Sequence, residues 1–133
     1  MMLGDQLGEL QSRETARRVL PGGDVEVSYE AEGELLGVAT NEIATYESTM
    51  DANGVLVGEG QGVTMTADGD VVVWHGNGIG RFTGTAPGAM SWRGAIFFDT
   101  SSERFARLNS AVGLFEYDTD GSGKGAAKFW EWK

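Results

Sequence analysis

The segment from Asp24 to Leu35 alternates strictly between two kinds of residue. One set is Val25, Val27, Tyr29, Ala31, Gly33 and Leu35, and the other is Glu26, Ser28, Glu30, Glu32 and Glu34. A period of two residues places these sets on opposite faces of a β-strand. The segment therefore predicts a strand with one apolar, buried face and one acidic, solvated face, which is typical of an antiparallel sheet that is wet on one side.

Most of the remaining chain has the pattern of further strands joined by short turns. Strands are predicted at residues 42–50, 55–66, 71–80, 91–99, 112–118 and 126–133, with turn signals at Asn53-Gly54, Asp68-Gly69, Pro87-Gly88 and Asp120-Gly121. A serine cap, an early acidic residue and apolar residues three apart predict one short helix near residues 102–108. The segment Leu3–Leu20 fits either a helix or a strand.

The order of these elements predicts the fold class. Apart from the one short helix near residues 102–108, no helix separates neighbouring strands, which excludes parallel βαβ architecture. We predict an all-β protein: an antiparallel, up-and-down β-barrel of about eight strands with one short helix near residues 102–108. A β-sandwich is the alternative. At 133 residues the chain is expected to form a single domain over 1–133, with residues 1–9 as a candidate flexible N-terminal segment.

Two rows of alternating glycines mark the middle of the chain. Gly58, Gly60 and Gly62 share one face of their strand, and Gly76, Gly78 and Gly80 repeat the pattern in the next strand. Glycine weakens a strand, so the rows need a physical reason. Two reasons remain open. The strands coil sharply or carry aromatic rings across their bare backbone, or the missing side chains clear a ligand cavity.

Composition and charge limit the classes of partner. The net charge of −10 repels phosphate backbones and anionic membranes, so neither nucleic acid nor a membrane is an expected partner. The absence of cysteine excludes disulfides and thiolate metal sites. Residues 1–8 lack the features of a signal peptide and no apolar run is long enough to span a bilayer, so a cytoplasmic location is expected.

Two short motifs resemble ligand-binding loops but lack essential parts. Gly76-Asn77-Gly78-Ile79-Gly80-Arg81 has Arg81 where a dinucleotide loop needs its third glycine. Asp118-Thr119-Asp120-Gly121-Ser122-Gly123 begins like a calcium loop, but its twelfth position is Phe129 rather than glutamate. We therefore expect no metal and no cofactor.

Several polar and aromatic residues are candidates for lining a ligand site. Glu59 and Gln61 lie in mid-strand, and burial of that face would raise the pKa of the carboxyl and suit it to acid–base chemistry. His75 is the single histidine, which excludes a multi-histidine metal centre. Tyr46 and Glu116 can supply partners from other strands. The full candidate set is Tyr29, Tyr46, Glu59, Gln61, Trp74, His75, Trp92 and Glu116. The alternative is that Glu59 and His75 lie outside and the tryptophans are core residues.

Most of the chain after Asp24 carries a resemblance to a known group of proteins. The glycine-alternating middle and the segments SWRGAIFFDT, ARLNSAVGLFEYD and KFWEWK resemble small uncharacterised bacterial proteins of the allene oxide cyclase-like, or more loosely calycin-like and lipocalin-like, β-barrel group. Plant members of that wider group cyclise a fatty-acid epoxide, and dirigent relatives steer radical coupling. The resemblance implies a barrel, an apolar pocket and a tendency to form homo-oligomers, but it assigns no catalytic residue here.

Three functions follow as hypotheses. The first is a barrel that binds a small apolar ligand in its lumen, which requires an interior not completely filled by side chains. The second is a lumenal isomerase or cyclase in which Glu59, His75 or Tyr46 acts as acid or base. The third is a non-catalytic structural or interaction protein that assembles through the FWEWK tail. We favour the first and expect no catalysis.

Overall fold

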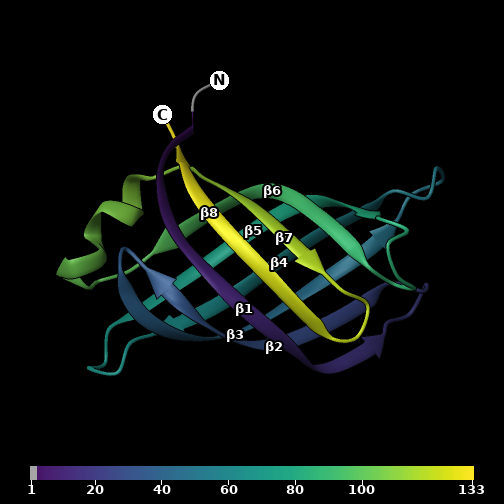
Figure 1. Cartoon of the computed structure of the whole chain (residues 1–133), viewed down its shortest axis with the longest axis horizontal. Coiled ribbons are helices and arrows are strands. Elements are labelled where there is room, and N and C mark those ends of the chain that lie inside the picture. The colour runs from purple at the N-terminus through teal and green to yellow at the C-terminus, as the bar shows by residue number, and fades with distance from the viewer. Residues whose placement is uncertain (1–2) are drawn as a thin grey trace.

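The computed structural model describes residues 3–133, which form a closed barrel of eight antiparallel strands (Figure 1). The strands are β1 (Leu3–Val19), β2 (Val25–Leu35), β3 (Val38–Met50), β4 (Leu56–Met65), β5 (Val71–Phe82), β6 (Met90–Asp99), β7 (Gly113–Thr119) and β8 (Lys124–Trp132). Each strand pairs with the next along the chain, and β8 closes the barrel by pairing with β1. The predicted up-and-down barrel is therefore confirmed, and the sandwich alternative is excluded.

The N-terminal segment, which fitted either a helix or a strand, is the first strand of the barrel. β1 pairs with β2 and β8, and its register shifts between Glu14 and Ala16. Leu7 is only 1% exposed, so residues 3–9 are part of the barrel wall, in contrast to the separate flexible segment expected for residues 1–9. Residues 1–2 of that expected segment lie outside the described residues. The sequence pattern did not identify β1 as a strand, because its inward face carries Ser12 and Glu14 as well as leucines.

A short 3-10 helix, η1 (Glu103–Ser110), closes one end of the barrel. It confirms the helix predicted near residues 102–108. Phe105 and Leu108 are fully buried and fill the barrel end beneath it. Arg104 ties the helix to the turn between β4 and β5 by ion pairs with Asp68, at 2.8 Å, and with Asp70. In Figure 1 this helix lies at the left, and the loops that join β1 to β2, β3 to β4, β5 to β6 and β7 to β8 lie at the opposite end.

The alternation of residues along each strand decides which side chains enter the barrel. In β2 the apolar set faces inward and the glutamates face outward, as the sequence predicts. In β4 and β5 the glycine rows face inward. The buried core extends to the helical end of the barrel and includes Leu7, Leu35, Val72, Ile96, Phe98, Phe105 and Leu108. No helix within residues 3–133 is long and apolar enough to cross a membrane.

Candidate functional site

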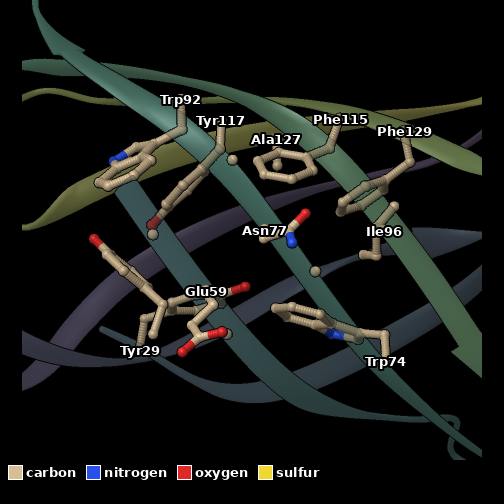
Figure 2. A pocket seen from close by; sticks show the side chains of 15 residues that line it. Tyr29, Glu59, Trp74, Asn77, Trp92, Ile96, Phe115, Tyr117, Ala127 and Phe129 are labelled. Atoms are coloured by element: carbon tan, nitrogen blue, oxygen red, sulfur yellow. The ribbon is translucent and has the colours of Figure 1, made fainter. Parts of the chain in front are cut away.

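The lumen contains a small cavity lined mainly by aromatic side chains. Its volume is about 70 Å³. The rings that line it are Tyr29, Tyr46, Trp74, Trp92, Phe115, Tyr117 and Phe129. Figure 2 shows Trp92, Tyr117, Phe115 and Phe129 on one side of the cavity, facing Tyr29 and Trp74 on the other. The inner cavity is smaller than the roughly 150 Å³ that takes up a benzene ring, so it can hold only one end of a flat molecule between its two aromatic walls.

A wider, open mouth leads to this cavity from the end opposite η1. Its volume is about 430 Å³, and Phe82, Met90 and Leu56 contribute apolar surface to it. Four aromatic residues, Tyr29, Tyr46, Trp92 and Tyr117, line both the mouth and the inner cavity. Trp92 and Tyr46 meet edge to face with ring centroids 5.7 Å apart, and the ring centroids of Tyr29 and Tyr117 are 5.8 Å apart. These four rings form a neck between the mouth and the inner cavity.

The glycine rows on β4 and β5 let aromatic rings lie directly against the backbone. A Cβ atom at Gly58 would come within 2.6 Å of the Trp92 ring, and one at Gly62 would overlap the indole of Trp74. In the same rows, a Cβ at Gly78 would meet the backbone oxygen of Arg93 at 2.6 Å, which indicates close approach of neighbouring strands. The rows thus carry aromatic rings across their bare backbone, which was one of the two roles left open. The same backbone is also part of the cavity wall.

A buried carboxyl group lies beside the aromatic cavity. Glu42 on β3 is 7% exposed, and three side chains donate hydrogen bonds to it. Thr64 Oγ1 donates to Glu42 Oε1 at 2.7 Å, and Trp74 Nε1 donates to the same oxygen at 3.0 Å. Tyr29 Oη donates to Glu42 Oε2 at 2.7 Å. Both carboxyl oxygens are thus occupied, so Glu42 holds Tyr29 and Trp74 in fixed positions at the cavity wall.

Burial dominates the electrostatics of this cluster. It raises the pKa of the Glu42 carboxyl above its ordinary value, although the three hydrogen bonds oppose the shift. The pKa of Tyr29 is raised well above its ordinary value by burial and by the neighbouring Glu42. Burial likewise raises the pKa values of Tyr46 and Tyr117. The tyrosines therefore stay protonated at neutral pH and present hydroxyl groups rather than charges to the lumen.

The structure brings the rings of four of the eight candidate residues together in the lumen and points the side chains of the other four outward, although Glu59 also borders the inner cavity. Tyr29, Tyr46, Trp74 and Trp92 line the cavity with their rings. The side chains of Glu59, Gln61, His75 and Glu116 lie on the outer surface, because the glycine face of β4 and the Trp74 face of β5 point inward. His75 stacks on Phe97 with ring centroids 5.6 Å apart, and Glu116 lies 3.7 Å from Arg93. Glu59, Gln61 and His75 share a surface groove of about 310 Å³.

Sequence reasoning missed Glu42, the polar residue at the centre of the interior cluster. A usable signal existed, because Glu42, Ala44 and Tyr46 share one face of their strand. The opposite face carries Ile43, which is 54% exposed. The apolar residue thus faces solvent and the carboxylate faces the core, the reverse of the usual distribution. Residues 3–133 contain no group of three or more histidine, aspartate or glutamate residues placed to hold a metal ion.

Comparison with known proteins shows which fold the chain shares with solved structures, but it does not assign the chain to a family. No protein-family model matches the chain, and no curated protein matches it. A protein of unknown function from Clostridium acetobutylicum superposes with a TM-score of 0.84 at 11% identity, covering 98% of this chain and 97% of that chain. A β-barrel-like protein from Acinetobacter baumannii gives a TM-score of 0.81 at 13% identity, covering 99% and 96%. An enzyme from Penicillium herquei gives 0.66 at 14% identity, covering 96% and 92%. At these identities the likeness shows a shared barrel fold.

Proposed function

We propose that this protein binds a small, largely apolar molecule in the lumen of its barrel. The observation that carries the proposal is the lumen itself, which narrows from a mouth of about 430 Å³ through a neck of four aromatic rings to an inner cavity. A barrel that served only as a scaffold would gain stability by filling this space, since interiors are normally packed without voids. The retained space supports a binding role.

The chemistry of the walls indicates the kind of molecule that fits. The inner cavity is almost wholly apolar, and the polar groups of the nearby Glu42 cluster are already satisfied by one another. Tyr117 Oη likewise shares a hydrogen bond with Ser12 Oγ at 2.8 Å. A ligand that brought many polar groups into this space would leave them without partners, which costs free energy. We therefore infer a flat aromatic or conjugated ligand with few polar atoms.

The test uses an uncharged fluorescent probe and a matched pair of variants. N-phenyl-1-naphthylamine is titrated into the protein, and its emission is expected to rise on entering the lumen. Ala127 is buried and lines the inner cavity, whereas its neighbour Ala126 points outward. Ala127→Leu should fill the cavity and weaken binding roughly tenfold or more, while Ala126→Leu should leave binding unchanged. Thermal unfolding of both variants checks that they remain folded.

The outcomes of this titration separate binding in the lumen from adsorption to the surface. Equal affinities of the two variants would show that the probe binds elsewhere, and no binding to the wild type would remove the proposal. A native mass spectrum of protein purified without refolding adds a second readout. A fixed extra mass that is retained by the Ala126→Leu variant and lost in Ala127→Leu would support a natural ligand in the lumen. The same spectrum reports whether the chain forms a homo-oligomer, which stays a prediction.

A lumenal isomerase or cyclase of the allene oxide cyclase-like type is a second proposal, and one residue favours it. Of the three residues expected to act as acid or base, Glu59 and His75 lie outside the barrel, while Tyr46 lines the lumen. Its phenol is protonated at neutral pH and can donate a hydrogen bond to an oxygen atom of the substrate, although burial raises its pKa and makes it a weaker acid. Incubation with an unsaturated fatty-acid epoxide should then give a cyclised product of unchanged mass, and Tyr46→Phe should slow its formation while preserving the affinity for the probe.

A further inference from the structure

Trp92 presents a hydrogen-bond donor that nothing in the structure uses. The side chain is 4% exposed and lies across the bare backbone of Gly58 and Gly80. Its Nε1 is buried and has no hydrogen-bond partner among residues 3–133. Trp74 lies across Gly62 in the same manner, but its Nε1 donates to Glu42. Of these two similarly placed indoles, one has its acceptor within the protein and the other lacks one.

The position of this donor relates it to the path into the lumen. Trp92 lines both the mouth and the inner cavity, so it belongs to the neck that a ligand would pass. Figure 2 shows its nitrogen at the end of the ring that lies away from Trp74 and Phe129, two residues that line the inner cavity but not the mouth. A buried donor without a partner destabilises a protein, and buried polar groups are nearly always paired. An acceptor atom on a bound molecule would remove this penalty.

The charges near the neck indicate which chemical group of the ligand accepts this hydrogen bond. Arg17 is the cationic side chain at the mouth, and its guanidinium is already paired with Glu14 at 2.6 Å. Glu42 already places a carboxyl group in the interior, and the whole chain carries a net charge of −10. A carboxylate or phosphate on the ligand would therefore be repelled and would lack a free cation to pair with. An uncharged carbonyl oxygen meets the requirement without these costs.

We propose that Trp92 Nε1 is the recognition donor of the lumen and that the ligand is an aromatic or conjugated ketone, aldehyde or similar neutral carbonyl compound. Its apolar rings lie along the neck and the mouth with one end in the inner cavity, and its carbonyl oxygen accepts the Trp92 hydrogen bond at the neck. The inference rests on the proposed binding function and adds to it the chemical class of the ligand.

The test compares two ligands, one with and one without a carbonyl oxygen. It also compares two variants, each of which replaces one of the two lumenal indoles by a phenyl ring. The ligands are 2-acetylnaphthalene and 2-isopropenylnaphthalene, in which a methylene group replaces the carbonyl oxygen. Displacement of N-phenyl-1-naphthylamine measures both affinities in the wild type, in Trp92→Phe and in Trp74→Phe. The wild type should bind the ketone about three- to tenfold more tightly than the alkene. Trp92→Phe should lose this preference, and Trp74→Phe, which keeps the donor at the neck, should retain it.

A second measurement keeps the inference testable if Trp92→Phe does not fold. The carbonyl stretch of bound 2-acetylnaphthalene, recorded by infrared spectroscopy with wild-type protein, should shift to lower frequency than in an aprotic solvent, as it does when a donor bonds to the oxygen.

Each outcome supports one statement or overturns it. Equal binding of ketone and alkene by the wild type, or a preference that survives in Trp92→Phe, would overturn the role of Trp92 while leaving lumenal binding intact. Displacement of the probe by neither naphthalene would overturn the ligand class alone. Failure of the probe itself to bind would remove the proposed function and this inference together.

Discussion

The two indoles of the lumen make a matched experiment on stability as well as on binding. Trp74→Phe and Trp92→Phe are the same chemical change at two inward positions, each with its ring lying across a glycine backbone. Both substitutions remove the pyrrole part of an inward-facing indole, which is buried at Trp92 and partly buried at Trp74. They differ in the hydrogen bond, because Trp74 Nε1 donates to Glu42 at 3.0 Å whereas Trp92 Nε1 has no acceptor among the described residues. The difference between the two costs therefore isolates the donor.

The expected size of that difference follows from the two environments. Removal of a donor from a buried carboxyl group costs about 1.5 to 3 kcal/mol, since the other partner remains buried. Removal of an unpaired donor recovers a desolvation penalty of about 1 to 3 kcal/mol. Because the two contributions add, Trp74→Phe should destabilise the barrel by roughly 2.5 kcal/mol or more relative to Trp92→Phe. Against a typical total stability of about 5 to 15 kcal/mol, such a difference is easily measured.

Urea unfolding followed by far-ultraviolet circular dichroism is the appropriate assay, since it does not depend on the tryptophans that are changed. With a urea dependence of about 1 to 3 kcal/mol per molar, the two unfolding midpoints should differ by roughly 1 to 3 M. The unfolding midpoints of the wild type and Trp92→Phe should be nearly equal. Equal destabilisation by both variants would refute the reasoning, because it would mean that ring packing alone, and not the state of the N–H group, sets the cost.

Three further predictions concern the interior and the closed end. The raised pKa of Glu42 means that its protonated form favours the folded state, so its contribution to stability is full below its ordinary pKa of 4.5 and is lost as the pH rises through the folded-state value. Wild-type stability relative to Glu42→Gln should therefore fall with rising pH above about 4.5, and a difference that rises would contradict the sign. Phe105→Ala should cost about 3 to 5 kcal/mol in urea unfolding because its ring is fully buried beneath η1; a cost below about 1 kcal/mol would show that the helix does not plug the barrel. Gly62→Ala should cost about 1 to 3 kcal/mol and alter the near-ultraviolet circular dichroism of Trp74, since the new Cβ overlaps the indole; an unchanged spectrum would count against the close contact.

Much of the wall of the barrel could be predicted from sequence because the relevant signals are local. The alternation at residues 25–35 matches β2 at both ends, and the Asn53-Gly54 turn lies between β3 and β4 as expected. The predicted helix near 102–108 is η1, shifted by one or two residues. β1 could not be assigned because its inward face mixes leucine with serine and glutamate, a pattern that only pairing with both β2 and β8 makes favourable.

The site was harder to predict than the wall because it depends on register among strands that are distant in sequence. Sequence alone left open which face of β4 points inward, and that one choice moves Glu59 and Gln61 from the lumen to the surface. The glycines decide it, because Trp74 and Trp92 need the bare backbone of Gly62 and Gly58 beneath them. No local signal links these positions, since each contact joins side chains that are adjacent only after the strands have paired.

The interior of the barrel has two parts. In one, the buried polar groups find hydrogen-bond partners within the protein, and in the other a buried donor does not. Toward η1, Glu42 gathers donors from Tyr29, Thr64 and Trp74, and apolar side chains pack the remaining space. Toward the mouth, the packing gives way to a cavity, and the Trp92 indole finds no acceptor among residues 3–133. The unpaired N–H group offsets the packing that the larger tryptophan ring gains over phenylalanine at position 92, so stability alone gives no reason for tryptophan there. The tryptophan at the neck is therefore best explained by a molecule that enters from the mouth and supplies the missing acceptor.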